Sequence, residues 1–316
     1  MQQPDIFRLG DPHLGRRFFN GVPLAKQGMR EARVWLEFEA MLRPPLPFLH
    51  VCMGDLFDKA QVSYTTLMRA GMMYRHAAQL NPTTTFLILK GNHDWEKDLE
   101  RVAAFDVFEA LVTDVPNIEI VSEWQMIGRR AFLAWHPVWS PEALVNQLPA
   151  GEVDEVYCHW DVDFGSHLIP TELLASKGIK TVYNGHVHKK RTFTENGVEV
   201  HLVGSMQPYA HGEETDESLY VTRTLAQLDD GEDFSDRCLR VVLQPGETWD
   251  RTVDCLQFTL KKIGEADDEL PEVTLGDFDV PTLFAQAFAA VPAAITAQAL
   301  EQYYLRRNGD APNQDA

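Results

Sequence analysis

A run of apolar and β-branched residues, Thr84–Leu89, leads into the tetrapeptide Gly91-Asn92-His93-Asp94. Such a run favours a buried strand, and a glycine just after it allows a sharp turn. The polar residues would then lie together at the carboxyl end of the strand. An amide oxygen can bind a metal ion there, and an imidazole can donate a proton to a leaving group. The tetrapeptide predicts metal-assisted chemistry if other polar residues join it in the fold.

Four further polar motifs follow apolar segments elsewhere in the chain. Ligands bind at the carboxyl ends of strands in open α/β sheets, so these motifs can converge. Each motif alone could be an ordinary turn or loop, but their joint occurrence favours a metal site. They are Gly10-Asp11-Pro12-His13, Gly54-Asp55-Leu56-Phe57-Asp58, His159 after Val156–Cys158, and Gly185-His186-Val187-His188.

The order of these five motifs resembles the calcineurin-like metallophosphoesterase superfamily. The resemblance implies a layered α/β fold, with two β-sheets sandwiched between helices, and two divalent metal ions that share the ligand Asp55. Two ions about 3.5–4 Å apart can provide a nucleophile at neutral pH and clamp a phosphoryl group. By the resemblance, one ion is held by Asp11, His13, Asp55 and His188, and the other by Asp55, Asn92, His159 and His186. Such mixed ligands suit Mn²⁺, Fe or Zn²⁺ better than Ca²⁺, and family analogy favours Mn²⁺.

The resemblance also assigns the two catalytic residues. It places His93 beside the leaving-group oxygen, as a general acid or an electrostatic stabiliser, and makes Asp94 the carboxylate that orients its ring. For the lone histidine ligand, His159 is favoured over His136 and His167 because an apolar strand leads into it.

Within the superfamily, local features resemble SbcD-type DNA repair exonuclease subunits. These features are the opening Asp11–Gly15, Asp94 at the end of its tetrapeptide, and the run Gly204–Pro208. The resemblance implies a DNA substrate, with Arg16 and Arg17 binding backbone phosphates, although both could belong to a solvated loop. The alternative is a phosphatase or phosphodiesterase for small-molecule or protein phosphoesters. A net charge of −19 is consistent with that alternative, because nucleic-acid binders usually carry a basic face.

Periodicity predicts helices over residues 25–42, 61–79 and 98–111, and Asn196-Gly197 predicts a hairpin. We expect a catalytic domain over residues 1–228 and an accessory region over 229–316, with strands, an acidic linker and a C-terminal helix over 281–307. An SbcC-type ATPase could dock on that helix, although a helix packed on its own domain explains the pattern at least as well. Related subunits often form homodimers, but no segment establishes one here.

Neither a signal-peptide pattern nor an apolar run of about 20 residues occurs, so we expect a cytoplasmic protein without membrane attachment. The four cysteines are scattered, which argues against a disulfide framework or a Cys-rich zinc site.

Overall fold

The computed structural model describes residues 6–263, except 99, 215 and 229–230. Residues 1–5 and 264–316 lie outside the described part. The predicted acidic linker and C-terminal helix fall in that second range, so both stay predictions. The chain divides into two units, Met1–Lys262 and Ile263–Ala316.

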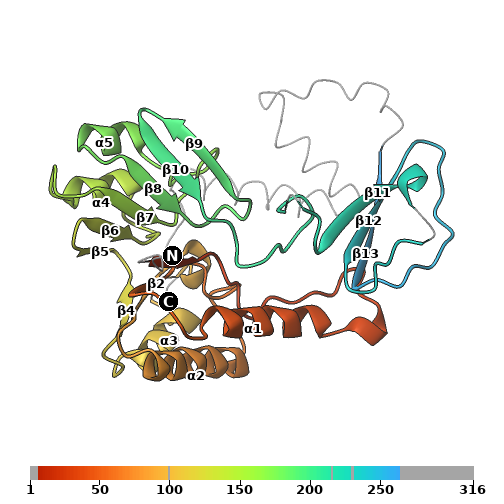
Figure 1. The fold of residues 1–316 in the computed structure, drawn as a ribbon, viewed down its shortest axis with the longest axis horizontal. Helices are drawn as coiled ribbons and strands as arrows, with labels where there is room; N and C mark the ends of the chain where they lie inside the picture. The colour runs from red at the N-terminus through yellow and green to blue at the C-terminus, as the bar shows by residue number, and fades with distance from the viewer. Residues whose placement is uncertain (1–5, 99, 215, 229–230, 264–316) are drawn as a thin grey trace, which may run out of the picture. The chain divides into compact units, whose positions relative to one another are not determined.

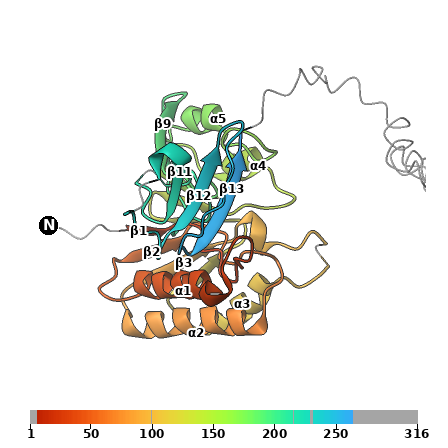
Figure 2. The same ribbon diagram turned by 90° about the vertical axis from the view of Figure 1, so that its right-hand side faces the viewer.

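The first sheet consists of four parallel strands in the order β1-β2-β3-β4. Its apolar strand residues alternate between two buried faces. One face packs against three helices, which Figures 1 and 2 show together on one side of the sheet. The elements are β1 (Ile6–Leu9), β2 (Leu49–Cys52), β3 (Thr85–Leu89) and β4 (Ile118–Val121), with α1 (Met29–Met41), α2 (Tyr64–Leu80) and α3 (Ala104–Val112). Short 3-10 turns precede α1, as η1 (Leu24–Lys26), and follow β3, as η2 (Asn92–Asp94).

The second sheet has six strands in the order β5-β6-β7-β8-β10-β9. Its core strands are parallel, and antiparallel pairs close both edges. The predicted hairpin at Asn196-Gly197 joins β9 to β10, with both turn residues at positive φ. The elements are β5 (Trp124–Ile127), β6 (Arg130–Leu133), β7 (Glu155–Cys158), β8 (Thr181–Asn184), β9 (Arg191–Glu195) and β10 (Val198–Leu202), with α4 (Pro141–Gln147) and α5 (Thr171–Ser176).

The two sheets pack face to face. Val51 and Leu87 of the first sheet share a buried cluster with Phe132 and Tyr157 of the second. The outer face of the second sheet buries apolar residues of α4 and α5, such as Leu144 and Leu174. This order of helices, sheet, sheet and helices confirms the predicted layered α/β fold.

A third, parallel sheet follows, built from β11 (Tyr220–Thr224), β12 (Cys238–Leu243) and β13 (Gln257–Lys262), with the turn η3 (Leu225–Gln227). It has its own apolar cluster, which includes Val221, Leu239 and Val241. The predicted boundary after residue 228 falls inside this sheet, because β11 lies before it and β12 after it. The first compact unit continues to Lys262.

All three predicted helices begin later than expected, and the third differs most. The helix expected over 98–111 begins only at Ala104, where the carboxylate of Asp106 accepts the Ala103 N–H at 2.7 Å and caps the first turn. The strands after Ile118 divide between the two sheets. β4 joins the first sheet, and β5 with β6 joins the second, so the chain crosses between sheets at residues 122–123.

A buried histidine in β2 predicts a pH-dependent stability. His50 lies between the rings of Phe7 and Phe86, and burial lowers its pKa to about 4. Because this folded-state pKa is below the ordinary 6.5, the unfolded chain binds the proton first as the pH falls. The stabilising contribution is complete above pH 6.5 and is lost on acidification towards pH 4. Its full size is about 3 kcal/mol, from about 1.4 kcal/mol per pKa unit.

We expect urea unfolding to show this loss between pH 7 and pH 4.5. The variant His50→Gln does not titrate and retains an N–H donor for the Met41 carbonyl that His50 Nε2 contacts at 3.2 Å. Its free energy of unfolding should fall by about 2–3 kcal/mol less than that of the wild type over the same pH range. Equal losses in both proteins would contradict the assignment.

Candidate metal centre

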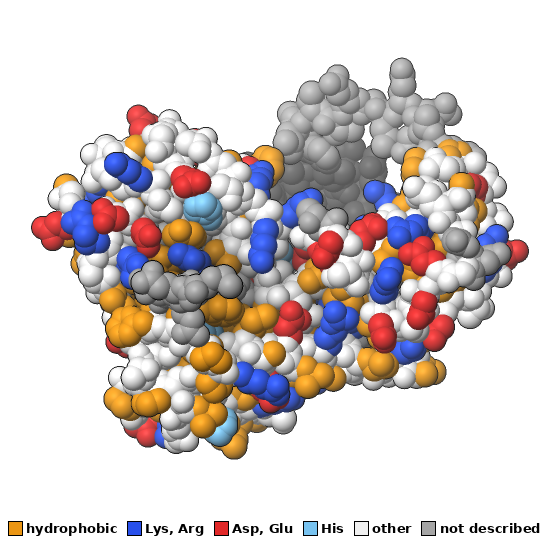
Figure 3. All heavy atoms as spheres, in the orientation of Figure 1, with side chains coloured by type: hydrophobic (Ala, Val, Ile, Leu, Met, Phe, Trp, Pro, Cys, Tyr) orange, Lys and Arg blue, Asp and Glu red, His pale blue; other side chains and the backbone are white. Residues whose placement is uncertain are grey.

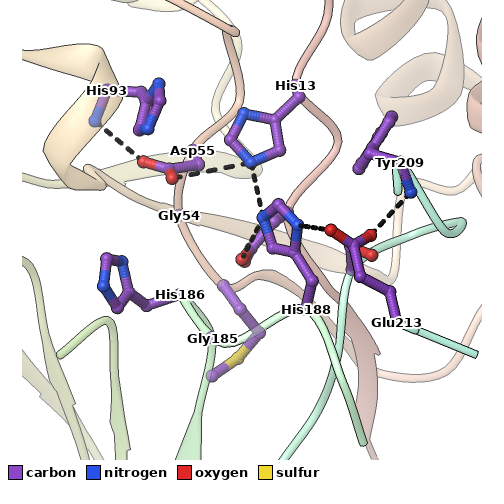
Figure 4. Close-up of polar contacts among 12 residues, drawn as sticks. His13, Gly54, Asp55, His93, Gly185, His186, His188, Tyr209 and Glu213 are labelled. Atoms are coloured by element: carbon purple, nitrogen blue, oxygen red, sulfur yellow. Dashed lines mark hydrogen bonds and ion pairs between the residues drawn. The ribbon is translucent and has the colours of Figure 1, made fainter. Parts of the chain in front are cut away.

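Seven side chains converge where the carboxyl ends of the two sheets meet, and Figure 4 shows most of them. The first sheet contributes residues after β1, β2 and β3, and the second contributes residues after β7 and β8. The side chains are those of Asp11, His13, Asp55, Asn92, His159, His186 and His188, which are the predicted ligands. The structure thus brings the predicted set together from two sheets and five loops.

The first group of ligand atoms comes from Asp11, His13 and His188. The two imidazoles face each other, with 2.9 Å between their Nε2 atoms. His188 Nε2 lies 3.8 Å from Asp11 Oδ2, and His13 Nε2 lies 3.7 Å from Asp55 Oδ2. One potential ligand atom from each of the three residues lies within 4.8 Å of the others, a spacing that can hold a metal ion.

The second group is formed by Asp55, Asn92, His159 and His186. His159 Nε2 lies 3.3 Å from Asp55 Oδ1 and 3.1 Å from Asn92 Oδ1. His186 Nδ1 lies 3.0 Å from the same Asn92 oxygen. Asp55 therefore directs Oδ2 towards the first group and Oδ1 towards the second, as a bridging ligand requires.

Asp11 tests whether these residues fit a cation. Its side chain is fully buried, and neither carboxylate oxygen accepts a hydrogen bond. Burial raises its pKa to about 6. A buried ionised group without a partner is costly, so unpaired oxygens next to two imidazoles call for positive charge. Carboxylate, amide and imidazole donors together suit a divalent transition metal. The residues present therefore fit the two-ion centre.

The histidines are held by contacts at their second ring nitrogen. Asp161 Oδ1 lies 2.9 Å from His186 Nε2, and Glu213 Oε1 lies 3.0 Å from His188 Nδ1. The Nδ1 atom of His159 lies 2.8 Å from the Met53 carbonyl oxygen. Such contacts fix the tautomer and direct the other nitrogen at the metal position. Sequence reasoning missed Asp161 and Glu213, because neither belongs to a motif.

The backbone at the site is strained. His13, Asp55 and His186 have φ values of 44°, 49° and 63°. Non-glycine residues rarely adopt this left-handed region, and such residues cluster at functional sites. Close packing enforces the loop at Asp55, because a Cβ on Gly54 would lie 2.3 Å from His159 Nδ1.

The charges around His159 favour its protonated form in the absence of a metal. Burial alone would lower its pKa, but the carboxylates of Asp55 and Asp11 outweigh burial and raise the pKa to about 9. Burial dominates at His186 and lowers its pKa to about 4. A metal ion at the second group must therefore displace a proton from His159, and its affinity should fall as the pH is lowered.

His93 lies beside this centre with an exposed side chain. Its Nδ1 lies 2.6 Å from the Asp58 carbonyl oxygen, so Nδ1 carries the proton, and its backbone N–H donates to Asp55 Oδ1 at 2.9 Å. Its ring lies edge-on to that of His13 at 5.0 Å. The carbonyl of Asp58 therefore orients the imidazole.

Asp94 does not contact the His93 ring, contrary to the predicted orienting role. Its buried carboxylate accepts backbone N–H bonds from Leu56 at 3.2 Å, Phe57 at 3.0 Å and Gly91 at 2.9 Å. Buried N–H groups must be paired, and this need directs the carboxylate away from the centre. Asp94 joins the loop after β2 to the loop after β3, so it positions the ligands through the backbone.

The remaining predicted residues differ in their distance from the centre. Arg16 Nη1 lies 3.4 Å from Asp58 Oδ1, and its guanidinium lies 5.0 Å from the Tyr209 ring, which contacts His13 edge-on. Arg17 is exposed and forms no hydrogen bond or ion pair with the described residues.

The two competing histidines contact each other instead of the centre. His167 Nε2 lies 2.9 Å from the His136 carbonyl oxygen, and His136 Nδ1 accepts the N–H of Val138 and of Trp139. Neither belongs to a potential ligand group found among the described residues. Those groups are Asp11-His13-His188, His13-Asp55-His93 and Asp55-His159-His186.

The role of Asp94 predicts a loss of stability on truncation. Asp94→Ala leaves three buried N–H groups without an acceptor, at about 1–3 kcal/mol for each unpaired group before relaxation. We expect the free energy of unfolding to fall by roughly 3 kcal/mol in urea titrations. Asp94→Asn keeps one acceptor oxygen and should lose less. Unchanged stability of Asp94→Ala would rule out this role.

The outer carboxylates, Asp161 and Glu213, are expected to affect metal binding through the histidines that they contact. Glu213→Gln and Asp161→Asn remove a charge without changing side-chain size, and each should weaken binding of Mn²⁺ by about 10–100-fold. Titration calorimetry on metal-free protein measures the two sites. Glu199→Gln changes the same charge beside His201, which is not a predicted ligand, and serves as the control. Unaltered affinities in both variants would contradict the positioning role.

Comparison with known proteins agrees with this geometry. A family model, Calcineurin-like phosphoesterase, matches residues 6–190, which include all seven ligand candidates. Among solved structures, the chain is similar to a phosphopantetheinyl hydrolase from Mycobacterium tuberculosis, with 10% identity, a TM-score of 0.39, and coverage of 65% of this chain and 93% of that chain. No curated protein matches the chain. The family match spans more than half of the 316 residues. The chain therefore belongs to the calcineurin-like phosphoesterase family, whose members hydrolyse phosphoesters at a divalent metal centre.

Proposed function

We propose that this protein is a nuclease that hydrolyses phosphodiester bonds of DNA, with Mn²⁺ as its metal. The observation that carries the proposal is the presence of basic side chains on two sides of the candidate metal centre. Arg16 lies beside His13 and Asp58, and Lys189 and Lys190 line a hollow of about 340 Å³ next to His188. Local cations beside the reacting phosphate are what a polyanionic substrate needs.

The residues of the centre divide the chemistry between them. Bound divalent ions supply Lewis acidity towards phosphoryl oxygens and lower the pKa of water. The carboxylate of Asp55 lies between the two ligand groups, and the Asp58 carbonyl fixes the His93 tautomer. When protonated, His93 can donate a proton from Nε2 to the leaving oxygen while its Nδ1–H stays on that carbonyl. Arg16 can bind a non-bridging phosphate oxygen.

A second candidate function is hydrolysis of small-molecule or protein phosphoesters. The hollow that contains Lys189 and Lys190 is also lined by Glu213, Glu214 and Asp216, which would repel a polyanion. On the face shown in Figure 3, basic side chains lie among acidic ones and do not form a broad patch. The net charge of −19 also favours this second function.

Among the described residues, no helix combines the length and apolarity needed to cross a membrane.

The two functions are separated by the substrate that the metal-loaded full chain degrades. We expect Mn²⁺-stimulated cleavage of linear single- or double-stranded DNA, tested with each divalent metal in turn. Turnover of nucleotides, phosphopeptides or generic phosphoesters without any DNA cleavage would support the second function and overturn the first.

Two variants predict different losses at the centre. His93→Ala should lower turnover by about 10²–10⁴-fold and leave metal affinity unchanged, because the ring supplies a proton and not a ligand. Asp55→Ala should lose both activity and metal binding, since both groups contact its carboxylate. Metal titration and steady-state turnover measure the two effects. His76→Ala, an exposed histidine on α2, is the control and should retain both. Wild-type activity in either of the first two variants contradicts the assignment.

A further inference from the structure

A hollow of about 330 Å³ is lined by Arg16, and its other lining residues have no role in the chemistry described so far. Three segments form it: the loop after β1, the α1 helix and the first turns of α2. Its charged and aromatic lining consists of Arg16, Arg17, Arg69, Glu31 and Trp35. The hydroxyl residues Ser63, Thr65 and Thr66 also line it.

Arg16 connects this hollow to the reacting centre. The guanidinium lies 3.4 Å from Asp58 Oδ1, and that same oxygen lies 3.9 Å from His13 Nδ1. The backbone carbonyl of Asp58 holds the His93 ring at 2.6 Å. Arg16 therefore contacts the residue that lies beside His13 and His93, and Arg16 also lines the hollow.

Two of the three arginines of the hollow form no ion pair with the described residues, and the third, Arg16, pairs with Asp58. The first two are Arg17 and Arg69, although the chain as a whole is acidic. The one lining carboxylate is Glu31, whose Oε1 accepts the Phe18 N–H at 3.1 Å. The lining carries three guanidinium groups and one carboxylate, and Asp58 neutralises Arg16, so a net positive charge remains, which favours an anionic ligand.

Trp35 positions the third guanidinium. The Arg69 guanidinium carbon lies 4.4 Å from the centre of the Trp35 ring. This cation–π contact holds the guanidinium beside the ring, and no hydrogen bond to a described residue occupies its N–H groups, so they stay able to donate. A planar fork of N–H donors matches two oxygens of a phosphate.

We propose that this hollow binds a second, non-scissile phosphate of the substrate, with Arg69 as a specificity residue that sequence reasoning did not find. The inference rests on the proposed nuclease function and deepens it. The preferred substrates are nucleotide chains that carry at least one phosphate beyond the bond that is cleaved.

The test compares dinucleotides that differ only in the second phosphate. The Mn²⁺-loaded full chain is assayed with thymidylyl-thymidine and with its 5′-phosphorylated and 3′-phosphorylated forms. Arg69→Gln should lower kcat/KM at least about tenfold for one phosphorylated form, mainly through KM, and leave thymidylyl-thymidine unchanged. The slope of log(kcat/KM) for that form against log salt should also decrease by about one.

The matched control is Arg75→Gln. Arg75 lies on the same helix but pairs with Asp114, and it does not line the hollow. It should leave the ratio between the substrates unchanged. Equal loss for all three dinucleotides in Arg69→Gln, or no loss for any, would overturn the proposal.

A binding measurement separates this proposal from the nuclease proposal. In metal-free protein, 5′- or 3′-phosphorylated thymidylyl-thymidine in the hollow should change the fluorescence of Trp35, and Trp35→Phe identifies that signal. Arg69→Gln should raise Kd for one form about tenfold or more. If no dinucleotide or DNA is cleaved but this Arg69-dependent binding is found, the nuclease function fails and the phosphate site stands. Wild-type affinity in Arg69→Gln rejects the site.

Discussion

The structure depends on two carboxylates, Asp11 and Asp55, that are buried where the two sheets meet. They are 0% and 2% exposed, and Asp11 has no hydrogen-bond donor for either oxygen. Burial of such groups is tolerable only if positive charge compensates them. The imidazoles around them supply part of that charge, and cations would supply the rest. The ligand loops and their strained backbone place the imidazoles next to these two carboxylates. The outer carboxylates hold those imidazoles in position.

Both ligand groups draw on both sheets. The first group joins Asp11 and His13 from the first sheet to His188 from the second, and the second group joins Asp55 from the first sheet to His159 and His186 from the second. A cation bound to either group is therefore a crosslink between the sheets, in addition to the apolar contacts of Val51 and Tyr157 beneath it. Metal binding and the docking of the sheets are then linked, because a ligand that binds only the folded state stabilises it.

The convergence of the candidate ligands could be predicted from the sequence because each motif is local. An apolar strand and the polar residues just after it are adjacent in the chain, and parallel pairing brings the strand ends together. The outer contacts depend on long-range packing instead. Glu213 reaches His188 from a different segment, and Arg69 meets Trp35 from another helix. Asp94 was misassigned because the buried N–H groups that it pairs cannot be read from its neighbours.

The left-handed backbone at His13, Asp55 and His186 has a consequence for protein engineering. Transplanting the seven side chains onto another α/β scaffold would not recreate the centre, because ordinary turns would aim them elsewhere. The unit to be copied is the set of loops, together with glycines such as Gly54 that let the loops touch. In this protein, the shape of the main chain is as much a part of the chelator as the donor atoms.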